Sequence, residues 1–188
     1  GSEGMKPDDQ QRVLDITRRQ WRGPEGQMQD LLSADEAENL RIRAGTLNDA
    51  ERKIINNHIV VTIKMLESLP WPKQLRNVTE YAGGHHERMD GKGYPKGLTR
   101  EQMSPQARMM AIADIFEALT AADRPYKKGN TLSEALEILG GFRQRNHIDP
   151  DLFDVFVRSK VYQQYADKFM PANQIDEVDH SKIPGFVP

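Results

Sequence analysis

Apolar residues recur every three or four positions along much of the chain, which is the period of an amphipathic helix. The longest such stretch runs from Asn48 to Leu69, and Asn48 and Glu51 form a capping box at its start. Its predicted buried stripe comprises Ile55, Ile59, Ile63 and Leu66. Other helices are predicted at 7–21, 33–40, 75–85, 104–119, 131–140 and from 149 past 161. The pattern therefore indicates an all-α protein, a bundle of five to seven helices.

Local signals mark the ends of these helices. The starts are predicted at N-cap residues, namely Ser33, Ser104, Thr131 and Asp149. The pair Gly140 and Gly141 is expected to end the helix that begins at Thr131. The last helix is expected to be long, with a core face that comprises Leu152, Phe153, Phe156, Val157 and Val161.

The same pattern divides the chain into three parts. Residues 1–44 are predicted to be an N-terminal extension of short helices and a connector, which begins with a Gly-Ser pair typical of a tag remnant. Residues 45–170 are predicted to form the main helical domain. Residues 171–188 are acidic and weakly periodic, so this arm is expected to pack on the domain or to fray.

Composition narrows the chemistry that the chain can support. The 188 residues include no cysteine, so any metal must be held by His, Asp or Glu. A formal charge of −2 gives no reason to expect binding to bulk nucleic acid. No run of 18 apolar residues and no secretory segment occurs, so we expect no membrane span and a cytoplasmic protein.

The stretch from 85 to 95 reads His-His-Glu-Arg-Met-Asp-Gly-Lys-Gly-Tyr-Pro and is hard to explain as packing. Two neighbouring imidazoles reach one metal only where the backbone bends or ends. Gly91 and Gly93 supply that bend, and Pro95 ends the turn. The alternative is a capping or surface pair. The surrounding motif favours His85 and His86 as metal ligands.

Two further ligand candidates lie on predicted helices. His58 is one turn from Ile54 and Ile55, so its side chain is predicted to face the core. A single histidine beside an apolar stripe is more often a core residue than a ligand, but the histidine pair favours the ligand. Asp114 interrupts another apolar stripe, where a carboxylate must be paired or bound to metal. A structural pairing with arginine or backbone is the alternative, and the three histidines favour metal.

A cationic cluster follows at 123–128, with the sequence Asp-Arg-Pro-Tyr-Lys-Lys. Such a cluster is most often solvated surface. Beside a metal site it is also suited to hold phosphate, Arg124 through paired hydrogen bonds and Lys127 as a point charge. His147 has no partner pattern and is interpreted as structural.

These motifs resemble the HD-GYP phosphohydrolases over roughly residues 45 to 160. The family's His-His pair matches His85 and His86, and its Gly-Tyr-Pro matches Gly93, Tyr94 and Pro95. A Leu-Asn pair at 47–48 opens the helix of His58, much as a Leu-Thr segment does in the family. The segments Ala113-Asp114, Ala118-Leu119-Thr120 and 123–127 match three further family motifs.

The resemblance implies a helical bundle of the HD-domain superfamily and hydrolysis of cyclic di-GMP. It implies a divalent metal held by His58, His85, His86 and Asp114. Such nitrogen and carboxylate ligands suit Fe, Mn, Zn or Ni, and the sequence does not choose among them. The residues implied to bind substrate are Tyr94, Arg124 and Lys127, and those implied to shape the loop are Gly91, Gly93 and Pro95.

The sequence departs from the family because no histidine precedes His58, so it lacks the namesake His-Asp dyad. Glu117 also stands where the family commonly has Asp. One interpretation is the C-terminal part of a longer enzyme with the dyad and sensory regions upstream, inactive as this isolated chain unless Glu87 or Asp90 replaces the dyad. The alternative is a non-catalytic signalling module that binds a nucleotide or a partner, such as a diguanylate cyclase domain, through the Gly-Tyr-Pro loop.

Overall fold

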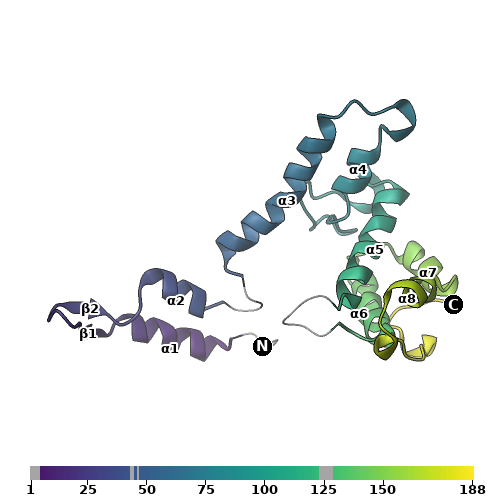
Figure 1. Cartoon of the computed structure of the whole chain (residues 1–188). Coiled ribbons are helices and arrows are strands. Elements are labelled where there is room, and N and C mark those ends of the chain that lie inside the picture. Colours follow the sequence, from purple (N-terminus) through teal and green to yellow (C-terminus); the bar gives the residue numbers. More distant parts are fainter. Residues whose placement is uncertain (1–4, 43–44, 46, 123–128) are drawn as a thin grey trace. The chain divides into compact units, whose positions relative to one another are not determined.

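The computed structural model describes the chain apart from residues 1–4, 43–44, 46 and 123–128 (Figure 1). Its contacts divide the chain into two compact units, residues 1–58 and residues 59–188. The boundary falls inside helix α3 (Asp49–Glu67), which therefore belongs to both units. The described part contains eight α-helices and one two-stranded sheet, which confirms the all-α class with one helix more than expected.

The first unit contains α1 (Pro7–Thr17), a small hairpin, α2 (Ala34–Leu40) and the start of α3. Strands β1 (Gln20–Arg22) and β2 (Met28–Asp30) pair antiparallel, with Trp21 opposite Gln29. The prediction that the first helix continues to Trp21 was wrong. The reason is the glycine turn that follows, in which Gly26 has a φ of 86° and closes the hairpin.

The second unit continues from α3 into α4 (Val78–Gly83) and α5 (Pro105–Thr120). It then adds α6 (Leu132–Gln144), α7 (Pro150–Arg158) and α8 (Val161–Phe169). Its described residues also contain four short 3₁₀ helices, at Lys73–Leu75, Arg100–Gln102, Ala172–Gln174 and His180–Lys182. Helix α5 packs against α4, α6 and α7 and is the central element of this unit. No helix among the described residues is long and apolar enough to cross a membrane.

The core of the second unit forms where α5, α6, α7 and α8 meet. Its fully or nearly fully buried members include Ile112, Phe116, Leu136, Leu139, Phe153, Val157 and Ala166. The C-terminal arm contributes Ile183 to the same core, so the arm packs on the domain. The predicted long last helix is instead two helices, because Lys160 adopts a left-handed conformation with a φ of 51° between α7 and α8. Val161, predicted to be buried, is 41% exposed.

The caps were predicted correctly because they depend only on neighbouring residues. Ser33 with Glu36, Asn48 with Glu51, and Thr131 with Glu134 all form the reciprocal capping-box hydrogen bonds. The stripe of α3 was predicted less well. Ile59 and Ile63 are buried and Leu66 is partly buried, whereas Ile55 is 55% exposed.

Helix α6 does not end at Gly140 and Gly141, as predicted, but continues to Gln144. Gly140 is buried because the arm crosses the helix there, and a Cβ at this position would lie 2.6 Å from the carbonyl oxygen of Pro184. A Cβ on Gly141 would meet only the flexible guanidinium of Arg145, at 3.3 Å. Close packing by the arm therefore explains why position 140 is a glycine.

Replacing Gly140 with alanine is expected to destabilise the protein by about 1–3 kcal/mol, since the arm must move to admit the methyl group. Gly141→Ala is the matched control. It is expected to be neutral or to stabilise by up to about 1 kcal/mol, because alanine favours the helix. Urea denaturation of the two variants checks this, and equal effects would contradict the packing of the arm on α6.

Candidate metal centre

Two buried glycines allow three helices to meet at the candidate site. A Cβ on Gly83 would lie 2.9 Å from Ile63 of α3, and a Cβ on Gly84 would lie 2.9 Å from the Cβ of Ala107 of α5. Any larger residue at these positions would push α4 away from its neighbours. The histidine pair follows directly, at the C-terminal end of α4.

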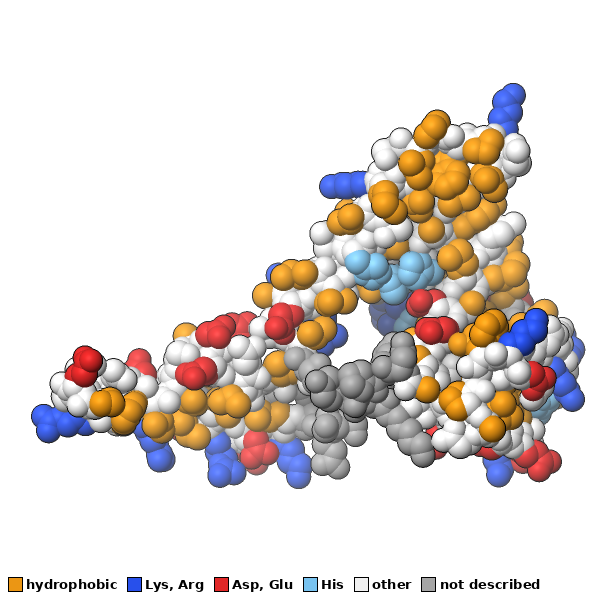
Figure 2. All heavy atoms as spheres, in the orientation of Figure 1, with side chains coloured by type: hydrophobic (Ala, Val, Ile, Leu, Met, Phe, Trp, Pro, Cys, Tyr) orange, Lys and Arg blue, Asp and Glu red, His pale blue; other side chains and the backbone are white. Residues whose placement is uncertain are grey.

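The structure brings three of the four predicted ligands together. His58, His85 and His86 each offer a ring nitrogen, and these three atoms lie within 4.8 Å of one another. Figure 2 shows histidine side chains gathered in one group on the surface. Such spacing suits the binding of one metal ion by all three rings after small adjustments. His85 and His86 are partly buried, and His58 is exposed.

Backbone contacts favour one tautomer of two of these histidines. The Nδ1 atom of His58 lies 2.5 Å from the carbonyl oxygen of Ile55, and that of His85 lies 2.6 Å from the carbonyl oxygen of Ala82. Because a carbonyl only accepts, a hydrogen bond at these contacts requires the proton on Nδ1, and a neutral ring of this form has its lone pair on Nε2. This is the usual arrangement of a metal-binding histidine whose other nitrogen donates to the backbone. The donor set therefore fits a divalent transition metal.

Tyr94 belongs to the glycine loop, residues 87–98, and lies against the histidine pair. Its ring stacks on that of His86, with centroids 4.8 Å apart and planes inclined by 18°. The rings of His85 and His86 are 4.1 Å apart. Burial raises the pKa of the Tyr94 hydroxyl, and the negative charge of Asp114 raises it further. Tyr94 is thus a neutral hydrogen-bonding group at the edge of the site.

Two orientations differ from the sequence prediction. His58 was expected to face the core, but it is exposed, because the buried Ile59 comes next and neighbouring helical residues point about 100° apart. Asp114 was expected to be buried in an apolar stripe, but it is also exposed on α5. It is not a member of the histidine group.

Asp114 nevertheless borders an open pocket of about 570 Å³ that His85 also lines. Glu117 adds a second carboxylate to this pocket. The rest of the lining is mostly apolar and comprises Met110, Ala113, Phe116, Phe156, Val161 and Tyr165. The pocket therefore places two acidic groups and several apolar side chains beside a candidate metal ligand.

The two carboxylates of the loop are engaged within the loop itself. Asp90 accepts two hydrogen bonds from Arg88, at 3.1 and 2.8 Å, and one from the backbone N–H of Lys92. Burial alone would raise the pKa of Asp90, but the bonds from Lys92 and Arg88 outweigh it and lower this pKa. Glu87 is 1% exposed and accepts only backbone donors among the hydrogen bonds described. These contacts oppose the idea that either residue replaces the missing dyad.

Glu87 is the residue at this site whose role the sequence did not indicate. Its place next to the histidine pair suggested a ligand, whereas its burial depends on how the loop folds back. Arg124 and Lys127, predicted to bind phosphate, lie outside the described residues. His147 is partly buried against Phe142, with ring centroids 4.8 Å apart, and burial lowers its pKa.

Residues 34–152 match the family model described as an HD domain, which is more than half of the chain. The chain belongs to the HD domain family. The similarity to HD-GYP phosphohydrolases is confirmed as well, since the HD-domain relatives include several named cyclic dinucleotide phosphodiesterases.

Three of these relatives show the extent of the match. The chain is 36% identical over 140 residues to a 3'3'-cGAMP-specific phosphodiesterase of Vibrio cholerae, which covers 74% of this chain and 31% of that protein. It is 38% identical over 117 residues to a cyclic di-GMP phosphodiesterase of Pseudomonas aeruginosa, covering 62% and 27%. It is 32% identical over 138 residues to a cyclic di-GMP phosphodiesterase response regulator of Xanthomonas campestris, covering 72% and 35%. The chain thus spans about a third of the length of these HD-domain relatives.

Proposed function

We propose that this HD-domain chain supplies the histidine-rich part of a metal-dependent phosphodiesterase that acts on a cyclic dinucleotide in signalling. The observation that carries the proposal is the group of His58, His85 and His86 beside the glycine loop. The Nδ1 atoms of two of the three rings lie against backbone carbonyl oxygens, a contact that suits metal binding through Nε2. The names of the relatives support a cyclic dinucleotide as the substrate class.

Each group has a role in this proposal. The three histidines are proposed to hold one divalent metal ion (Fe, Mn, Zn or Ni). Asp114, which borders the pocket that His85 lines, is proposed as a carboxylate ligand. When bound, such ions activate water and neutralise phosphate oxygens. The oxygen of water would then bond to phosphorus as one ester P–O bond breaks, the leaving oxygen would take up the proton that water gives up, and a linear dinucleotide would form. Tyr94, Arg124 and Lys127 are proposed to hold the nucleotide and its phosphates.

A second function follows from the missing dyad. No histidine precedes His58 in these 188 residues, so they include no His-Asp pair of the family type. A module without catalysis would bind a nucleotide, or would present Gly93, Tyr94 and Pro95 to a partner such as a diguanylate cyclase domain. In either case, sensory regions elsewhere in the whole protein are proposed to control the site. A His-Asp pair in a longer parent protein would favour the enzyme.

The isolated chain is expected to show no hydrolysis of cyclic di-GMP and to bind it weakly. Activity of the proposed kind needs two metal ions, and the ligands brought together here complete only one side of such a pair. The remaining phosphate contacts should be screened by salt. The test incubates the chain with cyclic di-GMP and Mn²⁺ or Fe²⁺ and separates the products by chromatography. Turnover by this chain that disappears in His86→Ala would show that the chain is catalytically active without the dyad.

A further inference from the structure

Glu87 is among the most deeply buried charged side chains of the second unit, although it lies next to the histidine pair. It is 1% exposed. Its Oε1 accepts the backbone N–H of Lys96 at 2.7 Å, and its Oε2 accepts the backbone N–H of Leu98 at 2.8 Å. Burying a carboxylate costs free energy unless hydrogen bonds satisfy its oxygens, and these two bonds satisfy both oxygens of Glu87. Both oxygens therefore point at the loop backbone.

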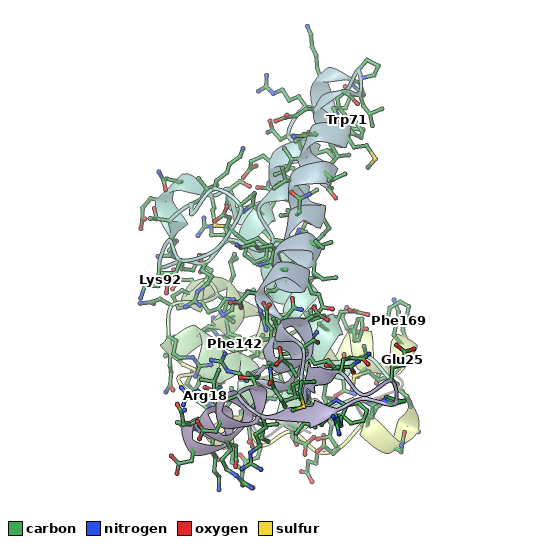
Figure 3. The ribbon with its side chains drawn as sticks, turned by 90° about the vertical axis from the view of Figure 1, so that its left-hand side faces the viewer. Arg18, Glu25, Trp71, Lys92, Phe142 and Phe169 are labelled. Atoms are coloured by element: carbon green, nitrogen blue, oxygen red, sulfur yellow. The ribbon has the colours of Figure 1, made fainter. Side chains whose placement is uncertain are left out.

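The bonds from Lys96 and Leu98 bring the end of the glycine loop back to Glu87, the residue at which the loop starts. The backbone of Glu87 also touches Gly93, where a Cβ would overlap the Glu87 main chain. Between these two contacts, the N–H of Tyr94 donates to the carbonyl oxygen of His86 at 3.2 Å. Lys92, at the outer edge of the loop, is exposed and labelled in Figure 3. The inner edge of the loop is thus held by residues 86 and 87.

The stacking of Tyr94 on His86 follows from this closure. Residue 94 lies between Gly93, which contacts the Glu87 backbone, and Lys96, which bonds to the Glu87 carboxylate. With both flanks fixed, the Tyr94 ring lies 4.8 Å from the His86 ring and nearly parallel to it. An aromatic neighbour in this position restricts the rotation of the His86 imidazole.

We propose that Glu87 is a positioning residue, whose buried carboxylate holds the loop so that Tyr94 sets the orientation of the His86 ring for metal binding. The importance of this for catalysis rests on the proposed function. The positioning itself concerns the chain without metal or substrate. Because both carboxylate oxygens bind backbone donors, Glu87 acts through the loop and is not itself a ligand.

Nuclear magnetic resonance of the metal-free chain tests the positioning. Stacking under Tyr94 shifts the His86 ring protons upfield, and Tyr94→Ala gives the value without the stack. Glu87→Ala is expected to remove more than roughly half of that shift, since the loop loses its two anchoring bonds. Glu87→Gln keeps the volume and one acceptor, so it is expected to lie between Glu87→Ala and the unchanged protein. If the alanine variant does not fold, the glutamine variant alone decides.

Gln174→Ala is the matched control for a general loss of stability. Gln174 is also buried, and its amide donates to two backbone carbonyls, those of Thr120 and Asn130. Its removal is expected to leave the His86 resonances unchanged. The proposal is overturned if His86 is unshifted in both Glu87 variants while Tyr94→Ala moves it. It is also overturned if Gln174→Ala moves the His86 resonances as much as Glu87→Ala does.

Metal affinity supplies a second readout that does not need turnover. In a Co²⁺ titration, Glu87→Ala is expected to bind about 10–100-fold more weakly than the unchanged chain, as loss of an outer-shell partner does. Glu87→Gln should restore part of that loss. Unchanged Co²⁺ affinity in both variants would overturn the link from the loop to the metal. If the unchanged chain binds no Co²⁺, the proposed function fails while the resonance test of Glu87 still stands.

Discussion

His86→Ala is expected to weaken the binding of a divalent metal by more than about a hundredfold, beyond the loss typical of outer-shell partners. The variant removes one of three clustered imidazoles, and two histidines alone leave too few ligands for a stable site. The helices should remain, because His86 is only partly buried and is not part of either buried core cluster. A Co²⁺ titration followed by visible absorption measures the affinity, and circular dichroism measures the helix content.

His180→Ala is the control for the His86 variant. His180 lies on the C-terminal arm, where its Nε2 is 2.8 Å from the hydroxyl of Tyr162, and it is not a member of the histidine group. Its removal should leave Co²⁺ affinity unchanged. Equal losses from the two variants would mean that the cobalt binds elsewhere or that histidine loss acts through stability.

Asp149→Ala is expected to lower the free energy of unfolding by about 3–5 kcal/mol, as the loss of one partner of a buried ion pair does. Asp149 is fully buried, caps α7 through the N–H groups of residues 151 and 152, and pairs with both Arg100 and Arg108. Without it, Arg108 is left as a largely buried cation. Urea denaturation measures the change.

Asp151→Ala is the matched comparison, because Asp151 pairs with the same Arg100 but its side chain is 76% exposed. An exposed pair contributes only about 0–1 kcal/mol, so this variant should be close to neutral. If the two variants were equally destabilised, the burial of Asp149 would not be the cause.

The Asp149 pair also predicts a dependence of stability on pH. Burial alone would raise the pKa of Asp149, but hydrogen bonds from Arg100, the Leu152 N–H and Arg108 outweigh it and lower this pKa. A lowered carboxyl pKa stabilises the folded state above the ordinary value near 4, and the stabilisation is lost as the pH falls through the lowered value. In denaturation below pH 4, the difference between Asp149→Ala and the unchanged chain should therefore shrink.

The helical class and the caps could be predicted from sequence because both depend on nearby residues. Ser33, Asn48 and Thr131 each bond to a backbone N–H three positions ahead. The errors arose where distant segments decide the outcome. Helix α6 passes through Gly140 because the arm packs there, and the last helix breaks at Lys160, which has no glycine or proline to mark it.

At the candidate site, too, features that depend on neighbouring residues were predicted and features that depend on distant segments were not. The histidine pair and the glycine loop were recognised because their residues are contiguous. The exposure of His58 and Asp114 was missed, since an apolar stripe on a helix does not show which of its members a neighbouring helix covers. The role of Glu87 was missed because its partners, the N–H groups of Lys96 and Leu98, become its neighbours only when the loop closes.

The central claim is that His58, His85 and His86 form one metal site. Its most direct test is elemental analysis of the chain after equilibrium dialysis against Mn, Fe, Zn or Ni, each at a fixed free concentration that keeps a weakly bound ion in place. The ligands brought together here predict at most one ion per chain, held weakly, and less in His86→Ala. Two tightly held ions per chain, or equal metal content in His86→Ala, would contradict the account.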